Sequence, residues 1–275
     1  MSIENKKERL IKFFRQYREG HLLFSAGMDS SAVLGAAVKA GCKLVPHWID
    51  NGFNRTTAED IQKQAENLGS DLFRINDVTP NQDVESNTNQ RCFHCKNQIL
   101  DTIPVDGSPV FDGTTASDIG GFRPGRRALR EYGVISPLVE LDITSEEAAA
   151  IALDFGADPE LAGMESCLAT RINYNIPITF ERLDAIRNIE RLIIEHTLDF
   201  DVRCRIDDDD HIRIELKKPE SYKLLTDEKI RQKLYESGQP VSLFVTVDVL
   251  SSRPNTYDKR LKSHLPAPPP KGEGN

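Results

Sequence analysis

The 275-residue sequence lacks a long apolar run, a secretory signal and an excess of positive charge. No segment approaches the roughly 18 consecutive apolar residues that a membrane-spanning helix needs. The opening stretch, MSIENKKERLIKFFRQYREG, has neither the apolar core nor the cleavage-like site of a signal peptide. Lys and Arg number 35 against 43 Asp and Glu, and this net charge of −8 argues against broad nucleic-acid binding. We therefore expect a cytoplasmic protein that uses neither a membrane nor nucleic acid as a partner.

Cysteines are few, and in a reducing compartment they act as thiols or ligands rather than disulfides. Cys42 and Cys204 lie in apolar or strand-like patterns and are expected to be structural. Cys92 and Cys95 form a C-x-x-C pair at a predicted helix start, and Cys167 lies in a polar segment. A zinc site would need a second such pair, which the sequence does not contain. Three thiolates suffice for a [4Fe-4S] cluster with one open iron, whereas an incidental pair is the alternative.

Strand-like and helix-like segments alternate over the first 165 residues. The predicted strands are residues 21–24, 43–50, 71–75, 109–112 and 134–138. Such alternation predicts an α/β fold, a parallel sheet with helices on both faces and ligands at the carboxyl ends of its strands. The loops expected at those ends are residues 25–31, 50–54 and 112–123.

The pattern changes near residue 165. A helix over 179–197 is followed by a hairpin pattern over 201–216, a helix over 226–237 and a strand over 242–250. We predict two domains, 1–165 and 166–255, the second smaller and of α+β type. Residues 256–275 end in a Pro/Gly-rich stretch and are expected to form a disordered tail.

The segment Ser25–Ser31 (SAGMDSS) connects a buried strand to a helical pattern. Glycine, hydroxyls and a helix N-terminus together suit a phosphate, although the Lys and spacing of a Walker loop are absent. The segment resembles the SGGxDS loop of the PP-loop ATP pyrophosphatases, with Ala26 in place of a glycine. A tight turn without a ligand is the alternative. The resemblance implies that ATP is bound by its pyrophosphate and that Asp29 helps to position Mg²⁺. The residues it implicates in ATP binding are Ser25, Gly27, Asp29, Ser30 and Ser31.

Three further segments are similar to motifs of the LarE family. Residues 167–174 (CLATRINY) resemble its CLASRxPYG segment, and residues 112–125 resemble its DG…D…RPG stretch. Residues 203–216 resemble its RVR…RIEL hairpin. LarE enzymes are ATP-dependent sulfurtransferases that adenylate a carboxylate of pyridinium-3,5-biscarboxylate mononucleotide and convert it to thiocarboxylate, on the route to the nickel-pincer nucleotide cofactor. Asn173 and Asn175 depart from the family pattern, which leaves room for another acceptor.

The resemblance also assigns the cysteines. Some family members give up the sulfur of one cysteine, and others carry three cysteines and are thought to use an iron–sulfur cluster. Because Cys92, Cys95 and Cys167 are all present, it implies that they bind a [4Fe-4S] cluster and that Cys167 and Asp29 are catalytic. The rival hypothesis is that Cys167 alone sacrifices its sulfur.

Several charged residues complete the predicted site. Lys96 and Arg123 are candidates to meet the phosphates of ATP. Arg203 and Arg205 lie two apart on a predicted strand, so both side chains face one side and suit an anionic acceptor. For each of these residues a solvated surface charge is the alternative. Acidic positions that gather a divalent metal in the family align with Glu190, Glu215 and Asp248.

The expected partners are a small carboxylated nucleotide as acceptor, sulfide or another sulfur donor, and further copies of the chain in a homo-oligomer. A tRNA-thiolating enzyme is the first alternative, against which stand the acidic charge and the absence of further cysteine pairs. A non-catalytic nucleotide-binding or iron–sulfur scaffold is the second.

Overall fold

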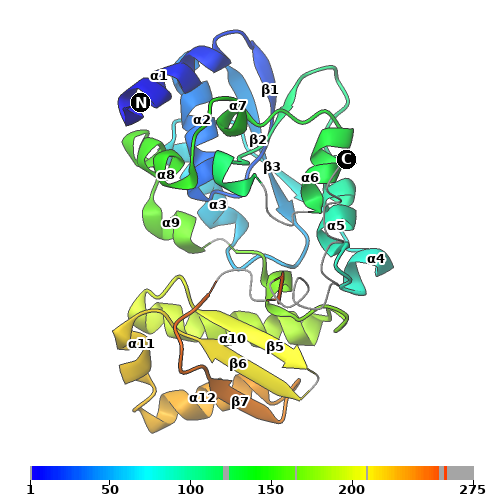
Figure 1. Cartoon of the computed structure of the whole chain (residues 1–275), viewed down its shortest axis with the longest axis vertical. Helices are drawn as coiled ribbons and strands as arrows, with labels where there is room; N and C mark the ends of the chain where they lie inside the picture. Colours follow the sequence, from blue (N-terminus) through cyan, green and yellow to red (C-terminus); the bar gives the residue numbers. More distant parts are fainter. Residues whose placement is uncertain (1, 120–123, 165, 209, 254–256, 259–275) are drawn as a thin grey trace, which may run out of the picture.

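The structure is a computed structural model that describes residues 2–119, 124–164, 166–208, 210–253 and 257–258. In this part of the chain, two sheets lie in separate units (Figure 1). Each sheet packs against a hydrophobic core of its own. The first sheet is parallel throughout, with strand order β3-β2-β1-β4, and the second is mixed, with order β5-β6-β7. This arrangement confirms the predicted α/β class with a smaller α+β unit.

The first unit contains four strands and a set of short to medium helices. Its strands are β1 (Glu19–Leu23), β2 (Lys43–Asp50), β3 (Arg74–Asp77) and β4 (Val110–Phe111). Its helices are α1 (Ile3–Phe14), α2 (Met28–Ala40), α3 (Ala58–Asn67), α4 (Gln82–Glu85), α5 (Arg91–Leu100), η1 (Ala116–Asp118), α6 (Gly125–Glu131), α7 (Pro137–Glu140), α8 (Ser145–Asp154) and α9 (Pro159–Met164). Because the four strands are parallel, their carboxyl ends lie at one edge of the sheet.

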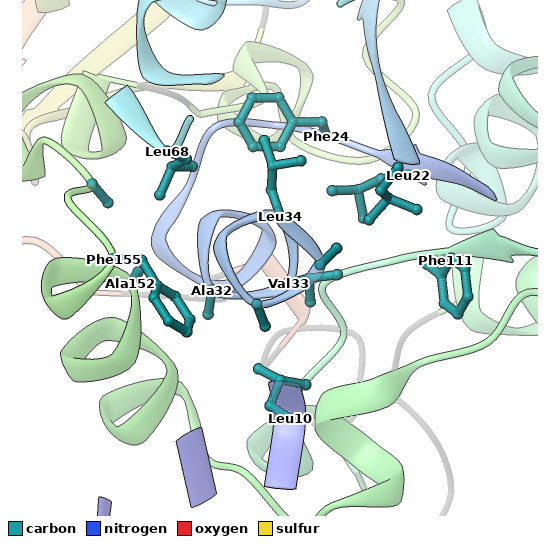
Figure 2. Close-up of a cluster of buried hydrophobic side chains, with 14 of the residues drawn as sticks. Leu10, Leu22, Phe24, Ala32, Val33, Leu34, Leu68, Phe111, Ala152 and Phe155 are labelled. Atoms are coloured by element: carbon teal, nitrogen blue, oxygen red, sulfur yellow. The ribbon is translucent and has the colours of Figure 1, made fainter. Parts of the chain in front are cut away.

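Helices cover both faces of the parallel sheet. Leu22 and Phe24 point into a core with α1, α2, α3 and α8, whereas Leu23 points into a core with α5 and α6. Helix α2 lies at the centre of the first core, with Leu10, Leu22 and Phe155 around it (Figure 2). A Cβ on Gly35 of α2 would lie 2.6 Å from the Phe155 ring, so this close packing requires glycine.

Two strand predictions are wrong in their extent. Residues 134–138 do not form a strand, since only Ile135 makes a bridge, to Phe111. Pro137 instead begins α7, because its fixed φ suits the first turn of a helix. Strand β3 begins at Arg74 rather than at residue 71.

The second unit packs helices onto the mixed sheet. Its elements are η2 (Leu168–Arg171), α10 (Phe180–Thr197), β5 (Arg203–Asp208), β6 (His211–Glu215), α11 (Pro219–Leu224), α12 (Glu228–Gly238) and β7 (Phe244–Val247). Strands β5 and β6 form the predicted antiparallel hairpin, and β7 adds parallel to β6. The helix predicted over 179–197 is α10, and it buries an apolar stripe from Leu183 to Ile194 in this second core.

The two units share packing and hydrogen bonds. Phe53 and Val84 of the first unit lie in the hydrophobic core of the second. The backbone N–H of Leu168 donates to the carbonyl of Phe53 at 2.7 Å. The boundary after residue 165 stays a prediction. Of the predicted tail, residues 256 and 259–275 lie outside the described residues, whereas Tyr257 is buried. Within the described ranges, no helix combines the length and apolar character needed to cross a membrane.

Candidate active site

Three cavities meet at Lys96, near the carboxyl edge of the parallel sheet. The loop cavity, of about 430 Å³, is lined by Ser25, Gly27, Asp29 and Ser30 together with Lys96. The thiol cavity, of about 270 Å³, is lined by all three candidate ligand cysteines and by Lys96. The basic cavity, of about 440 Å³, is lined by residues of both units, again including Lys96. Lys96 forms no ion pair with a residue in the described ranges. Its ammonium group is therefore available to an anion in any of the three cavities.

The loop that begins α2 is held by its own hydroxyl groups. Ser30 Oγ donates to the Gly27 carbonyl at 3.0 Å, and the Gly27 N–H donates to Ser25 Oγ at 3.4 Å. Ser31 is buried and donates to the Ala26 carbonyl at 3.3 Å, so its hydroxyl stabilises the loop backbone from the protein interior. Four of the five predicted loop residues therefore line the loop cavity, and Ser31 does not.

Two positions explain why this loop uses small residues. Ala26 has φ of +59°, a left-handed conformation that glycine adopts without cost, which accounts for the glycine of the SGGxDS pattern at this place. Gly113 packs onto the start of α2, where a Cβ would lie 2.7 Å from the backbone nitrogen of Ser30. Any side chain at Gly113 would therefore displace the loop.

Asp29 is placed among other acids. Its pKa is raised to about 6, first because it is partly buried and then because Asp118 and Glu146 repel its negative charge. A divalent cation would relieve this repulsion, so the donor set suits Mg²⁺. No three His, Cys, Asp or Glu side chains among the described residues gather closely enough to hold a metal ion alone. A magnesium ion here would therefore take its remaining ligands from phosphate oxygens and water, as is usual for it.

The raised pKa predicts a pH-dependent gain in stability for Asp29→Asn. A carboxyl with a raised folded-state pKa binds its proton better in the folded state, so its ionisation lowers stability as pH rises from its ordinary 3.8 to about 6. We expect the variant to melt at a higher temperature than the parent above pH 6 and equally near pH 3.8. Melting temperatures of both proteins across this range test it, and a constant difference would contradict the assignment.

The structure brings Cys92, Cys95 and Cys167 to the wall of one cavity, although they come from different units. Cys92 lies on the first turn of α5 and Cys95 at the start of the second, and Cys167 directly precedes η2. Cys92 and Cys167 are exposed, and Cys95 is half-buried. Burial raises the pKa of Cys95 to about 12, with the neighbouring Cys167 adding to the effect. The surrounding protein also raises the pKa of Cys167, which Arg91 opposes.

The two remaining cysteines behave as expected. Cys42 and Cys204 are buried within the first and second cores, respectively, and line none of these three cavities. Burial raises the pKa of both thiols, so they stay protonated.

Arg91 is a functional candidate that the sequence did not single out. It is buried, lines both the thiol cavity and the basic cavity, and donates to the Asn87 side chain and to the Ala169 carbonyl. Asn87 in turn donates to the carbonyls of Asn173 and Ile176 at 2.9 and 2.8 Å. These bonds fasten the chain segment after Cys167 to the start of α5. The only signal in the sequence was that Arg91 directly precedes the C-x-x-C pair.

Arg203 and Arg205 both line the basic cavity, as their spacing predicted. They are not equivalent, because Arg205 is buried and its Nε lies 3.3 Å from Glu215 Oε2. Arg203 donates to the carbonyls of Phe200 and Val202, and its pKa is lowered to about 10 by burial and by nearby cations. Arg203 Nη2 also lies 3.8 Å from Asp201 Oδ1, a longer and more exposed pairing than that of Arg205, so Arg203 is the better candidate to bind an added anion. Neither side chain is on an exposed face, since Arg205 is buried and Arg203 is half-buried.

Other cations complete the basic cavity. Arg126 lines it and donates to the carbonyl of Asp118, and Arg171 lines it from η2. Arg123 lies outside the described residues, whereas the neighbouring Pro124 and Gly125 line the cavity. The similarity of residues 123–125 to the RPG motif indicated this part of the cavity wall, but it did not single out Arg126.

The three acids that align with a family metal site are each paired with arginine. Glu190 accepts from Arg55 at 2.9 Å and from Arg171 at 2.7 Å, and all three side chains are buried. Burial alone would raise the pKa of Glu190, but these two cations hold it below its ordinary value. Glu215 and Asp248 both lie within 2.7 Å of Arg213 Nη1. These carboxylates are bound to arginines in the structure, and the described residues contain no group of three or more His, Cys, Asp or Glu side chains that could hold a metal ion.

Comparison with known proteins places the chain among poorly characterised relatives. No protein-family model matches it. It is 29% identical over 202 residues to an uncharacterized protein of Synechocystis sp., covering 68% of this chain and 73% of the relative. It is 25% identical over 182 residues to an uncharacterized protein of Methanocaldococcus jannaschii, covering 62% and 68%. One named relative is the pyridinium-3,5-bisthiocarboxylic acid mononucleotide synthase of Lactiplantibacillus plantarum, 24% identical over 201 residues, 70% of this chain and 73% of that enzyme.

Proposed function

We propose that this protein is an ATP-dependent sulfurtransferase of the LarE type, which adenylates a carboxylate of a small nucleotide and converts it to thiocarboxylate. The observation that carries the proposal is the meeting of a phosphate-type loop, a three-thiol cavity and a basic cavity at Lys96. The similarity to a named synthase of a bisthiocarboxylic acid mononucleotide supports the same substrate class.

The parts of the site suit the two halves of this reaction. A carboxylate is a poor electrophile, because oxide is a poor leaving group, and attack on the α-phosphate of ATP converts it to an acyl-adenylate from which AMP leaves readily. In our proposal the hydroxyl groups and N–H groups of the loop cavity hold the departing pyrophosphate, and Asp29 orients Mg²⁺ against it. Arg203 and Arg126 hold the anionic acceptor in the basic cavity.

We propose that Cys92, Cys95 and Cys167 hold a [4Fe-4S] cluster in the thiol cavity. Such a cluster, when bound, supplies an open iron that accepts sulfide. The donor set fits a cluster, because each thiolate would bind a different iron atom. The three sulfur atoms therefore need not converge on one point, as the ligands of a single metal ion must. Arg91 lies beside Cys92 and Cys167 and balances the negative charge of anionic sulfur. The apolar side chains of Phe24, Trp48 and Phe53 form part of the wall of this cavity.

The proposed function is tested with anaerobically purified protein, ATP, Mg²⁺, sulfide and pyridinium-3,5-biscarboxylate mononucleotide. We expect pyrophosphate release that depends on the acceptor, and an acceptor mass that increases as sulfur replaces oxygen. Iron and acid-labile sulfide should accompany the protein, which should keep its full mass after turnover. Loss of one H₂S equivalent from Cys167, with no iron present, would replace the cluster with a sacrificial cysteine. Failure to release pyrophosphate with any carboxylate would overturn the enzyme assignment.

Replacing Arg203 with glutamine should raise the KM for the acceptor about tenfold, because a charge-assisted contact contributes roughly 1.5–3 kcal/mol. The KM for ATP should change little, since Arg203 lines the basic cavity and not the loop cavity. Initial rates of pyrophosphate release at varied acceptor and ATP concentrations measure both constants. An equal increase in the two KM values would contradict this placement.

A further inference from the structure

Cys92 differs from the other two thiols in the cavities it reaches. It lines both the thiol cavity and the basic cavity, whereas Cys95 and Cys167 line the thiol cavity only. We infer that Cys92, rather than Cys167, is the thiol that contacts the acceptor, an inference that rests on the proposed function for the identity of the acceptor. The wall between the two cavities is shared by Arg91, Cys92 and Lys96.

The position of Cys92 is fixed by the residue before it. Arg91 Nη2 donates to Cys92 Sγ at 3.6 Å, while Nη1 donates to the Ala169 carbonyl at 2.9 Å and to the side chain of Asn87. The buried guanidinium therefore lies between Cys92 and the segment that follows Cys167. Its positive charge acts on both Cys92 and Cys167, but its recorded bond to sulfur is to Cys92.

Close packing of α6 on α5 keeps Cys92 beside Lys96. A Cβ on Gly125, the first residue of α6, would lie 3.2 Å from the Cys92 carbonyl oxygen and 3.8 Å from Lys96 Cβ. The next residue, Arg126, lines the basic cavity. The same helix start therefore holds Cys92 in place and supplies a cation to the cavity that Cys92 faces.

Cys95 and Cys167 line the thiol cavity but not the basic cavity, and Cys95 is the more buried of the two. Asn51 Nδ2 lies 3.7 Å from Cys95 Sγ and donates to it, and Cys95 packs against buried side chains of two hydrophobic clusters. Cys167 shares the thiol cavity with Phe53 and Ala169. An anion held by Arg126 and Arg203 therefore shares its cavity with Cys92 and with neither of the other two thiols.

Competitive alkylation of the iron-free, reduced full-length protein tests the inference. Iodoacetate and iodoacetamide modify each cysteine with the same chemistry, so the ratio of their rates at one residue cancels the intrinsic reactivity of that thiol. We expect the basic cavity to favour the anionic reagent at Cys92 by about tenfold relative to Cys167. Pyridine-3,5-dicarboxylate, a small dianion, should protect Cys92 and leave the labelling of Cys167 unchanged. Peptide mass spectrometry measures the rates.

Arg203→Gln is the matched variant for this experiment, since it removes a cation of the basic cavity without touching a cysteine. It should reduce both the anionic preference and the protection at Cys92, with Cys167 as the internal reference. Protection of Cys167 in place of Cys92, or no protection at either thiol, would overturn the inference. The labelling needs no ATP, iron or turnover, so a protein that protects Cys92 but releases no pyrophosphate would refute the proposed function alone.

Discussion

Replacing Glu190 with glutamine should lower the free energy of unfolding by about 3–5 kcal/mol, because it leaves two buried arginines without a counter-charge. The carboxylate of Glu190 is fully buried and bonds to Arg55, Arg171 and the backbone N–H of Cys204. An amide keeps nearly the same shape but carries no charge and offers one acceptor oxygen instead of two. Urea unfolding monitored by circular dichroism gives the difference.

The control for this prediction lies on the same helix. Glu195 of α10 is exposed, so Glu195→Gln should change the free energy of unfolding by less than about 0.5 kcal/mol. A similar small change for Glu190→Gln would show that the buried ion pairs contribute little. Because Arg55 belongs to the first unit and Glu190 to the second, the larger loss should be accompanied by earlier separation of the two units.

Asp29→Asn should reduce the rate of pyrophosphate release at least a hundredfold, since a metal ion near a leaving phosphate contributes several kcal/mol to the transition state. This prediction rests on the proposed function and on the position of Asp29 in the loop cavity. The same variant should be more stable than the parent at neutral pH, for the reason given with its raised pKa. Activity and stability are thus expected to change in opposite directions.

The matched control is Asp71→Asn, a change of the same chemistry at an exposed aspartate before β3. It should leave both the rate and the melting temperature close to those of the parent. Nearly normal pyrophosphate release by Asp29→Asn would remove the loop from the catalytic machinery. Measurement at several Mg²⁺ concentrations would show whether weaker metal binding causes the loss of rate. In that case, excess Mg²⁺ would restore part of the rate.

The sequence predicted the fold where local signals agreed. Thr144 and Glu147, three residues apart in the sequence, form the capping box that begins α8, and the apolar stripe of α10 faces the second core. The strand over residues 134–138 was wrong, because apolar residues alone do not distinguish a sheet edge from a short helix that begins at Pro137. The loop of residues 25–31 was recognisable because its chemistry is local.

The charges of the site were harder to predict, because their partners are distant in the sequence. Glu190 pairs with Arg55, 135 positions away, and no spacing rule connects them. One signal was available, since Glu190 follows Ile186 by four positions and Leu183 by seven, which places it on the buried face of α10. Arg205 and Glu215 belong to the same hairpin, but their contact depends on the strand register, which the sequence left open.

The thiol cavity takes its cysteines from both units, and this has a consequence for the order of events during synthesis. Cys92 and Cys95 are translated before Cys167, and they leave the ribosome well before the second unit can fold. Until Ala169 and the neighbouring carbonyls bind Arg91 and Asn87, the early pair has no third thiol beside it. The three-thiol site therefore forms only after the second unit has folded. Truncated or partly folded chains do not contain it.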